Sequence, residues 1–342
     1  MDKLTKIIEN DAKDTCKKID FTELLGKSIM ITGASGLIGT YFLACLKILN
    51  DKNPGKIKVI AVMQNESSDH LKSFLNFNNA DIYKGDLTNI DFCKELPSAD
   101  YIIHAAGYGQ PGLFMKDPVK TLKLNTLTTY NLFEKLSING KFLFVSSSEV
   151  YSGSPNLPYK ETDIGTTNTT HPRSCYIEAK RCGEAICKAY YNLGIEAKSA
   201  RLSLAYGPGT KKNDSRVINS FIKKAIDGKI ELLDEGKAKR TYCYVSDAIE
   251  IMWGILFSGK DPIYNVGGKS KTTIGELAKK IGFILNVPVI FPKSSTNTIQ
   301  GAPEDVFLDM SKIEKEFHKN KYIPLDKGLK KTINWQLELY NN

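Results

Sequence analysis

Two residues of the segment SCYIEAKR, Tyr176 and Lys180, have the types and the spacing that proton transfer needs. In an α-helix, residues four apart lie on one face, so the phenol and the ammonium would be neighbours. A free tyrosine has a pKa of about 10 and is a poor base near neutral pH, whereas a nearby positive charge favours the phenolate. The pair could then remove the proton from a substrate hydroxyl. The same spacing also occurs on ordinary helix surfaces, so the interpretation depends on the residues upstream.

A second polar group stands at the end of a predicted strand, in the segment FVSSSEVYSG. Open α/β sheets place their ligands at the carboxyl ends of the strands. Ser147 is the candidate to hydrogen-bond the reacting oxygen beside Tyr176, and Ser148 is a candidate substrate contact. Glu149 is predicted either to act as a general base or to hold the substrate, with capping of a loop as the alternative.

The segment TGASGLIGT lies upstream of both groups, between an apolar β-branched run and a helical pattern. A strand, turn and helix of this kind bind a dinucleotide pyrophosphate, because glycines allow close approach and the helix amino terminus offers free amides. In this context Tyr176 and Lys180 become catalytic candidates: while the phenolate takes the hydroxyl proton, a hydride passes from the same carbon to the nicotinamide. The residues predicted to line the pyrophosphate are Gly33, Ser35, Gly36, Leu37, Ile38 and Gly39.

Other segments indicate which dinucleotide binds. The second strand ends in AVMQNE, where Gln64 and Asn65 are neutral and no arginine is close enough to bind a 2′-phosphate, which favours NAD over NADP. Asp86 and Leu87, in KGDLTN, suit hydrogen bonding to the adenine and covering it. The nicotinamide half would pass small residues in HAAGYG, for which tight strand packing is the alternative explanation: Ala105, Ala106 and Gly107.

Strand-like and helix-like segments alternate along the first part of the chain. Short apolar runs are each followed by a stretch long enough for a helix, and this alternation predicts an α/β fold with a doubly wound parallel sheet of the Rossmann type. The predicted strands are residues 27–33, 56–63, 80–86, 99–107, 141–148 and 195–207.

The character of the sequence changes after Gly207, where GPGTKKNDS forms a turn-rich loop and shorter mixed segments follow. We expect a smaller, mixed α/β substrate domain there, while YCYVSDAIEIMWGIL and IYNVGG rejoin the main sheet. The expected ranges are 1–26 for an amino-terminal helical extension, 27–206 with about 241–266 for the NAD-binding domain, and 207–240 with 267–342 for the substrate domain.

Composition and charge argue against several functional classes. The chain has 342 residues, 42% of them hydrophobic, but no run of the ~18 to 20 apolar residues that span a membrane. Its amino terminus is too charged for a secretory signal, so we expect a cytoplasmic location. Seven cysteines without a CxxC pair and four scattered histidines favour neither disulfides nor a metal site. The net charge of +9 is interleaved with acids, which argues against a nucleic-acid partner and leaves capture of a small polyanion as the alternative.

Taken together, the motifs resemble those of the extended short-chain dehydrogenases/reductases, in their nucleotide-sugar epimerase/dehydratase group. The resemblance covers roughly residues 27 to 338. It is carried, in the family's order, by TGASGLIG, GDLTN, HAAG, LNT, VSSSEVY, YIEAK, YGPG, RTYCYVSD and YNVGG. It implies NAD in the Rossmann domain and a nucleoside-diphosphate sugar in the smaller domain. Such enzymes commonly oxidise the sugar at C4 and later reduce the ketone again.

The resemblance also implies roles for individual residues. Ser147, Tyr176 and Lys180 match the family's catalytic serine or threonine, tyrosine and lysine. Arg240 matches an arginine that grips the substrate diphosphate, and Arg216 matches a basic residue near the nucleotide; the planar guanidinium binds phosphate oxygens in pairs. The remaining residues expected from the family pattern are Asn125 at the cofactor and Tyr108, Ser148 and Arg173 at the substrate.

Within the family, HPRSCYIEAKRCGEAICKAY is most similar to UDP-glucuronate decarboxylases, which carry Thr-Ser-Glu where this chain has Ser147, Ser148 and Glu149. In those enzymes a 4-ketone beta to the C6 carboxylate makes loss of CO₂ easy. Two positions depart from the pattern: Val306 stands where decarboxylases have an arginine, and Leu204 stands where asparagine is usual.

Other activities remain open on the sequence alone. Dehydratases that act on dTDP-glucose use an Asp-Glu pair instead, whereas GDP-mannose-type dehydratases use Thr-Ser-Glu, so 4,6-dehydration is an alternative. A 4-epimerase needs only the serine, tyrosine and lysine. A non-catalytic dinucleotide-binding protein is the remote alternative. The family also implies a homodimer packed through the helix of Tyr176 and a helix around residues 117–137.

Overall fold

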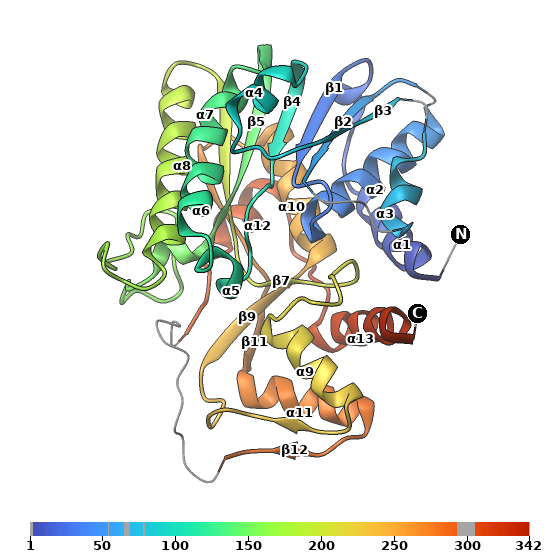
Figure 1. Ribbon diagram of the computed structural model, residues 1–342, viewed down its shortest axis with the longest axis vertical. Helices are drawn as coiled ribbons and strands as arrows, with labels where there is room; N and C mark the ends of the chain where they lie inside the picture. The colour runs from blue at the N-terminus through green and yellow to red at the C-terminus, as the bar shows by residue number, and fades with distance from the viewer. Residues whose placement is uncertain (1–2, 54, 65–68, 78, 293–304, 342) are drawn as a thin grey trace.

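A seven-stranded parallel sheet forms the larger part of the molecule (Figure 1). The computed structural model describes residues 3–53, 55–64, 69–77, 79–292 and 305–341. The strand order β10-β6-β5-β4-β1-β2-β3 confirms the predicted doubly wound sheet. Its strands are β1 (Ser28–Thr32), β2 (Lys58–Met63), β3 (Ala80–Lys84), β4 (Ala99–His104), β5 (Leu136–Ser147), β6 (Glu196–Leu202) and β10 (Ile263–Val266).

Helices cover both faces of this sheet because its strands are apolar on both sides. Ile29 and Ile31 of β1 pack into one core cluster, and Met30 between them packs into the other. The first cluster is covered by α1 (Lys3–Cys16), α2 (Leu37–Lys52), α3 (Asp69–Leu75) and α10 (Val245–Ser258). The second is covered by α4 (Ile90–Glu95), α6 (Pro118–Asn125), α7 (Leu127–Phe133) and α8 (Ser174–Asn192).

A smaller region lies beyond the carboxyl ends of the strands (Figure 1). It holds a three-stranded sheet, β11-β9-β7, and a two-stranded sheet, β12-β8. Its strands are β7 (Ala205–Tyr206), β8 (Ile230–Glu231), β9 (Lys239–Tyr244), β11 (Ser270–Thr273) and β12 (Val289–Ile290). Its helices are α9 (Val217–Ile226), α11 (Ile274–Leu285) and α13 (Leu325–Asn341), whereas α12 (Ser311–Phe317) packs on β10 and α10 of the larger part (Figure 1).

Several element boundaries differ from the predictions. The amino-terminal helix ends at Cys16, and a separate 3₁₀ turn follows at Thr22–Leu24. The helix expected around 117–137 is two helices, α6 and α7, with Thr126 between them at φ −115° and ψ −79°. The return to the main sheet comes later than residue 241, because β9 pairs with β11 and β7 up to Tyr244.

The amino-terminal helix α1 is held to the rest of the molecule through a buried carboxylate. Asp11 accepts a hydrogen bond from the Tyr41 hydroxyl of α2 at 3.1 Å and pairs with Lys331 of α13. A hydrogen bond therefore joins α1 to α2, the helix that follows the glycine-rich turn, and an ion pair joins α1 to α13. Within the described residues, the structure has no helix long and apolar enough to cross a membrane.

A short strand-like pairing connects the loop after β5 with the segment before α12. The amide of Tyr159 donates to the carbonyl of Phe307, and the amide of Asp309 donates to Tyr159, both at 2.8 Å. The same segment pairs with β9, where Thr241 donates to the Val306 carbonyl at 3.2 Å. These bonds fasten the smaller region to the end of β5, where Glu149 lies.

Candidate active site

The glycine-rich turn packs its backbone directly against the end of β4. Gly33 has a φ of +67°, and a Cβ there would come within 2.6 Å of the Ala105 carbonyl oxygen. A Cβ at Gly39 would lie 2.5 Å from the Gly33 carbonyl oxygen. Only glycine fits at either position. Helix α2 begins after Gly36, which has no side chain to cap the first amides, so these amides are available to a pyrophosphate. Ser35, Leu37 and Ile38 are half-buried along the same turn.

A buried histidine, His104, contacts the last residue of β1, directly before this turn. The Nδ1 atom of His104 lies 2.7 Å from the Thr32 hydroxyl, and its Nε2 atom lies 2.9 Å from the Leu124 carbonyl. Burial lowers the pKa of His104 to about 3, so the ring is neutral. The Thr32 hydroxyl also accepts from the amide of Ala106 at 3.2 Å. This role of His104 was not predicted, because its pairing with Thr32 depends on the register of β1 and β4, which only the structure shows.

Asp86, the predicted adenine contact, accepts hydrogen bonds from other residues of the protein. Its Oδ2 atom accepts from Lys120 Nζ at 2.6 Å, and its Oδ1 atom accepts from the amide and hydroxyl of Thr88. Burial opposes ionisation, but the bonds from Lys120 and Thr88 hold the pKa of Asp86 below its usual value. Leu87 is buried beside it. Asn65, predicted to bind the cofactor at the end of the second strand, lies outside the described residues.

Tyr176 and Lys180 share one face of α8, but burial has the largest effect on the pKa of Tyr176. Lys180 Nζ donates to the Val145 carbonyl at 2.7 Å and lies 5.8 Å from the centre of the Tyr176 ring. Burial lowers the pKa of Lys180 to about 7. Burial also raises the pKa of Tyr176 to about 12, and a hydrogen bond with Ser147 opposes that rise. Desolvation therefore opposes the phenolate that the predicted role of Tyr176 and Lys180 requires.

An open acceptor lies where the nicotinamide half was expected. The Oδ1 atom of Asn125 is buried and has no hydrogen-bond partner among the residues that the structure describes, while its Nδ2 atom donates to Thr121. A Cβ at the exposed Gly107 would be 3.7 Å from this oxygen and 3.8 Å from Lys180 Nζ. Gly107 thus leaves space between the Asn125 acceptor and the Lys180 amine. These two polar groups suit the amide and the ribose of a dinucleotide.

The sugar side of the site is a cluster of three charged residues: Glu149, Arg173 and Arg240. Arg173 donates from Nη2 to Glu149 Oε1 at 2.6 Å, and the two side chains are 9% and 18% exposed. Burial raises the pKa of Glu149, and the charges of Arg173 and Arg240 oppose that rise. In the described part of the chain, Glu149 Oε2 and Arg173 Nε have no hydrogen-bond partner. The cluster thus presents one buried acceptor and one buried donor to a ligand.

The other predicted substrate contacts are more widely spread. Arg216, at the start of α9, donates from Nη2 to Asp214 at 2.6 Å and from Nη1 to the Ala205 carbonyl. Ser148 is half-buried and begins a 3₁₀ turn, Ser148–Tyr151. Tyr108 is half-buried against the second core cluster. The structure therefore brings together Glu149, Arg173 and Arg240 next to Ser147 and Tyr176, and engages Arg216 with its own loop.

A buried polar network behind Ser147 was not predicted. Ser146 donates to Glu184 at 2.6 Å, and Glu184 receives Nη2 of Arg201 at 2.7 Å. Arg201 also donates to the Tyr151 hydroxyl at 2.8 Å, and that hydroxyl donates to Asn265. These bonds join α8, β6 and β10 and leave Ser146 no free role at the substrate. A glutamate on the buried face of α8, eight residues after Tyr176, was the signal for them.

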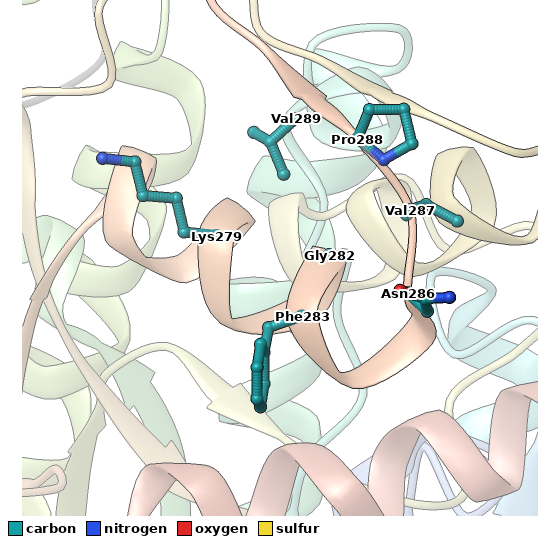
Figure 2. Close-up of a pocket in the computed structure, with 7 residues that line it drawn as sticks. All are labelled: Lys279, Gly282, Phe283, Asn286, Val287, Pro288 and Val289. Carbon is teal, nitrogen blue, oxygen red and sulfur yellow. The ribbon is translucent and has the colours of Figure 1, made fainter.

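A surface hollow of about 470 Å³ lies elsewhere, between α11 and the segment that leads to β12 (Figure 2). It belongs to the smaller region, far from α8 in Figure 1, and contains none of the predicted site residues. Among the residues that the structure describes, no group of three or more histidine, cysteine, aspartate or glutamate side chains could hold a metal ion. The hollow is lined by Lys279, Gly282, Phe283, Asn286, Val287, Pro288 and Val289.

Solved structures confirm the fold. The chain superimposes on the UDP-glucuronic acid 4-epimerase of Bacillus cereus with a TM-score of 0.75 at 23% identity, covering 92% of this chain and all of that one. The dTDP-glucose 4,6-dehydratase DesIV of Streptomyces venezuelae gives a TM-score of 0.77 at 22% identity, covering 92% of this chain and 98% of that one.

Sequence comparison gives the family. The chain is 28% identical over 312 residues to UDP-glucuronic acid decarboxylase 1 of Xenopus tropicalis, covering 90% of this chain and 72% of the relative. It is 29% identical over 280 residues to UDP-glucuronic acid decarboxylase 6 of Arabidopsis thaliana, covering 81% and 78%. Residues 29–267 match the model of the NAD dependent epimerase/dehydratase family. With its glycine turn and its Ser147, Tyr176 and Lys180 placed as described, the chain belongs to that family of NAD-dependent enzymes that modify nucleotide sugars.

Proposed function

We propose that the protein decarboxylates a nucleoside-diphosphate hexuronate through a 4-keto intermediate. The observation that carries the proposal is the Glu149–Arg173 pair beside Tyr176, with an unpartnered acceptor on Glu149 and an unpartnered donor on Arg173 among the described residues. With Arg240 close by, two guanidinium groups lie beside Glu149. A guanidinium binds a carboxylate through paired hydrogen bonds, so the two arginines suit the carboxylate of a sugar acid.

The chain's own residues supply proton transfer at C4. Tyr176 acts as the phenolate: it takes the proton of the C4 hydroxyl and becomes the neutral phenol, while Ser147 hydrogen-bonds to the phenol oxygen and to the reacting oxygen. The glycine turn and Asn125 would hold NAD, which when bound would supply the oxidation of that carbon and the later reduction of the ketone. Lys180, held by Val145, keeps an amine within the site whose positive form stabilises the phenolate.

Glu149 is assigned the proton transfer at C5. In the 4-keto sugar the C5–C6 bond breaks, its electron pair forms the C4–C5 enolate, and C6 leaves as CO₂. The enolate then needs one proton at C5. Burial raises the pKa of Glu149, so the residue holds a proton more readily than an exposed glutamate and can supply it there.

The proposal is tested by incubating the purified protein with UDP-, GDP-, CDP- and dTDP-linked sugars and sugar acids. Products are analysed by mass spectrometry and NMR. We expect CO₂ release and a pentose product from a hexuronate, with NAD extracted from the folded protein. Tyr176→Phe should lower turnover by about 10³-fold without loss of cofactor. Turnover of Tyr176→Phe at the parent rate, or no reaction with any hexuronate, contradicts the proposal.

A second candidate, 4,6-dehydration of a neutral sugar, is favoured by one observation. Val306, where the similar decarboxylases have an arginine, is buried and pairs through its backbone with Arg240. The cluster therefore has one guanidinium fewer than that pattern supplies. Loss of water from a nucleotide hexose, without CO₂ release, identifies dehydration. An unchanged mass with altered sugar coupling constants identifies 4-epimerisation.

We also propose that the protein forms a homodimer through α6, α7 and α8. Apolar side chains on α6 and α7 are unusually exposed, and a two-helix surface of this kind suits a second copy of itself. Light scattering during size-exclusion chromatography should give twice the chain mass, and Tyr130→Glu should give a monomer. A monomeric parent protein contradicts this proposal. The exposed side chains are Val119, Leu122, Leu127 and Tyr130.

A further inference from the structure

A phenylalanine from a short helix lies flat against the proposed catalytic base. Helix α5 (Pro111–Phe114) follows the HAAG segment, and the ring of Phe114 stacks on the ring of Tyr176. The ring centres are 4.4 Å apart and the planes differ by 8°. Phe114 is only 1% exposed. One face of the phenol is therefore covered by a hydrocarbon ring instead of water.

The same phenylalanine contacts the sugar side of the site. The guanidinium carbon of Arg173 lies 5.5 Å from the centre of the Phe114 ring, within the range of a cation–π contact. One ring thus contacts both the proposed base and the arginine that pairs with Glu149. A shift of this ring would change the positions of both groups together.

The backbone of Phe114 is fixed by neighbouring helices. Its carbonyl oxygen accepts from the Thr121 hydroxyl of α6 at 3.2 Å and from Cys175 Sγ of α8 at 3.6 Å. Its position is therefore set by the helix that carries Tyr176 and by the helix that carries Asn125.

The start of α5 is fastened to the smaller region. The side-chain oxygen of Gln110, the residue before α5, accepts from the amide and the hydroxyl of Ser215, both at 3.1 Å. Ser215 precedes Arg216, whose charge reaches Tyr176 and lowers its pKa slightly against the effect of burial. The α5 segment thus bridges the main sheet and the loop before α9, directly over the proposed base.

We propose that Phe114 is a positioning residue that fixes the plane of the Tyr176 ring, seats the Arg173 guanidinium and keeps water from the phenol. The inference rests on the role proposed above for Tyr176. A parallel stack restricts the phenol ring to movement within its own plane. Because catalysis needs the reacting atoms held in one geometry, a small tilt of the ring costs rate without costing affinity.

The test compares Phe114→Leu with the parent protein labelled with carbon-13 at tyrosine Cζ. The Tyr176 signal, identified by its absence in Tyr176→Phe, reports the ionisation of that one phenol. Without the covering ring, water reaches the phenol, and its titration should move down by about one pH unit. With a substrate that the parent protein turns over, kcat should fall about tenfold.

A matched control separates this role from packing in general. Phe133 is also buried and stacks on a tyrosine of α8, Tyr190, with ring centres 3.8 Å apart. Phe133→Leu should cost similar stability and leave the Tyr176 titration and kcat unchanged. If Phe114→Leu does not fold, Phe114→Met, whose unbranched side chain adapts to an irregular space, provides the same two measurements.

The two proposals fail in different ways. The NMR titration uses no substrate, so it judges Phe114 even if the protein acts on no hexuronate. An unshifted Tyr176 titration in a folded Phe114→Leu protein overturns the inference, as does an equal shift in Phe133→Leu. A shifted titration without CO₂ release from any substrate supports the inference and rejects the decarboxylase.

Discussion

The cofactor side and the sugar side of the site are assembled from different kinds of contact. On the cofactor side, Gly33, Gly39 and Ala105 meet through backbone atoms, with no room for a Cβ. On the sugar side, the charged cluster of Glu149, Arg173 and Arg240 meets through side chains from three separate segments.

This difference separates binding from reaction type. Backbone contacts recognise the pyrophosphate, which all dinucleotide cofactors share, and they depend on the spacing of glycines in one short segment. Side-chain charges can be exchanged singly without rebuilding the fold, so they decide which sugar reacts and how. Substitutions on the two sides should therefore have effects of different kinds.

Gly33→Ala should give the largest effect, because it breaks the cofactor side. Its Cβ would collide with the Ala105 carbonyl oxygen at 2.6 Å, in a left-handed backbone conformation. We expect about 3 kcal/mol less free energy of unfolding and no measurable NAD binding. Gly26→Ala is the control, since Gly26 has a φ of +81° but no heavy atom within 4 Å of the added Cβ. Urea denaturation measures the free energy of unfolding, and calorimetric titration measures NAD affinity. Equal losses in Gly33→Ala and Gly26→Ala would show that the collision at Gly33 is not the cause.

Glu149→Gln should change the reaction and spare the cofactor side. The amide cannot deliver a proton to C5, so CO₂ release should fall about 10²-fold while NAD affinity stays the same. The control is Glu178→Gln, which alters another glutamate–arginine pair, with Arg181, on the exposed side of α8. Rates come from CO₂ capture and affinities from titration. A parent-like rate would remove Glu149 from the mechanism.

Lys180 lies between the cofactor side and the sugar side, and its titration should make the free energy of unfolding depend on pH. Its folded pKa, about 7, lies below that of an unfolded lysine, so between pH 7 and 10 the unfolded chain binds the additional proton. Stability should therefore rise with pH, by about 2 kcal/mol from pH 7 to 9. Lys180→Met should abolish this rise, whereas Lys188→Met, on an exposed part of α8, should retain it. Denaturant titrations at each pH are the measurement; an identical slope in Lys180→Met would speak against the buried amine.

Leu204→Asn should give the smallest effect, and it tests whether the asparagine of the family pattern improves binding on the sugar side. Leu204 has a φ of +44°, where asparagine is tolerated better than leucine, and the family pattern has asparagine there. Relief of this strain is partly offset by lost packing, since Leu204 contacts the first core cluster. We expect a gain below about 1 kcal/mol in thermal unfolding and a lower KM for the sugar nucleotide. A loss of stability would show that packing outweighs the backbone strain.

The sequence determined the parts of this protein that depend on short segments. Alternation of apolar strands and helices predicted the parallel sheet, and TGASGLIGT predicted the turn, because close backbone approach demands glycine at set positions. Tyr176 and Lys180 lie on one helix face, as the spacing of four residues required. The break at Thr126 and the late return of the chain at Tyr244 were not predictable, since both follow from packing against distant segments.

Only the tertiary structure decided what surrounds the reactive groups. Nothing near Phe114 in the sequence indicates that its ring covers Tyr176, and nothing near Glu149 indicates that Arg173, 24 residues away, neutralises it. The proton affinities of Tyr176 and Lys180 follow the same rule. Desolvation depends on every neighbour that excludes water, whatever its distance along the chain, whereas spacing in the sequence reports only the neighbours on one helix.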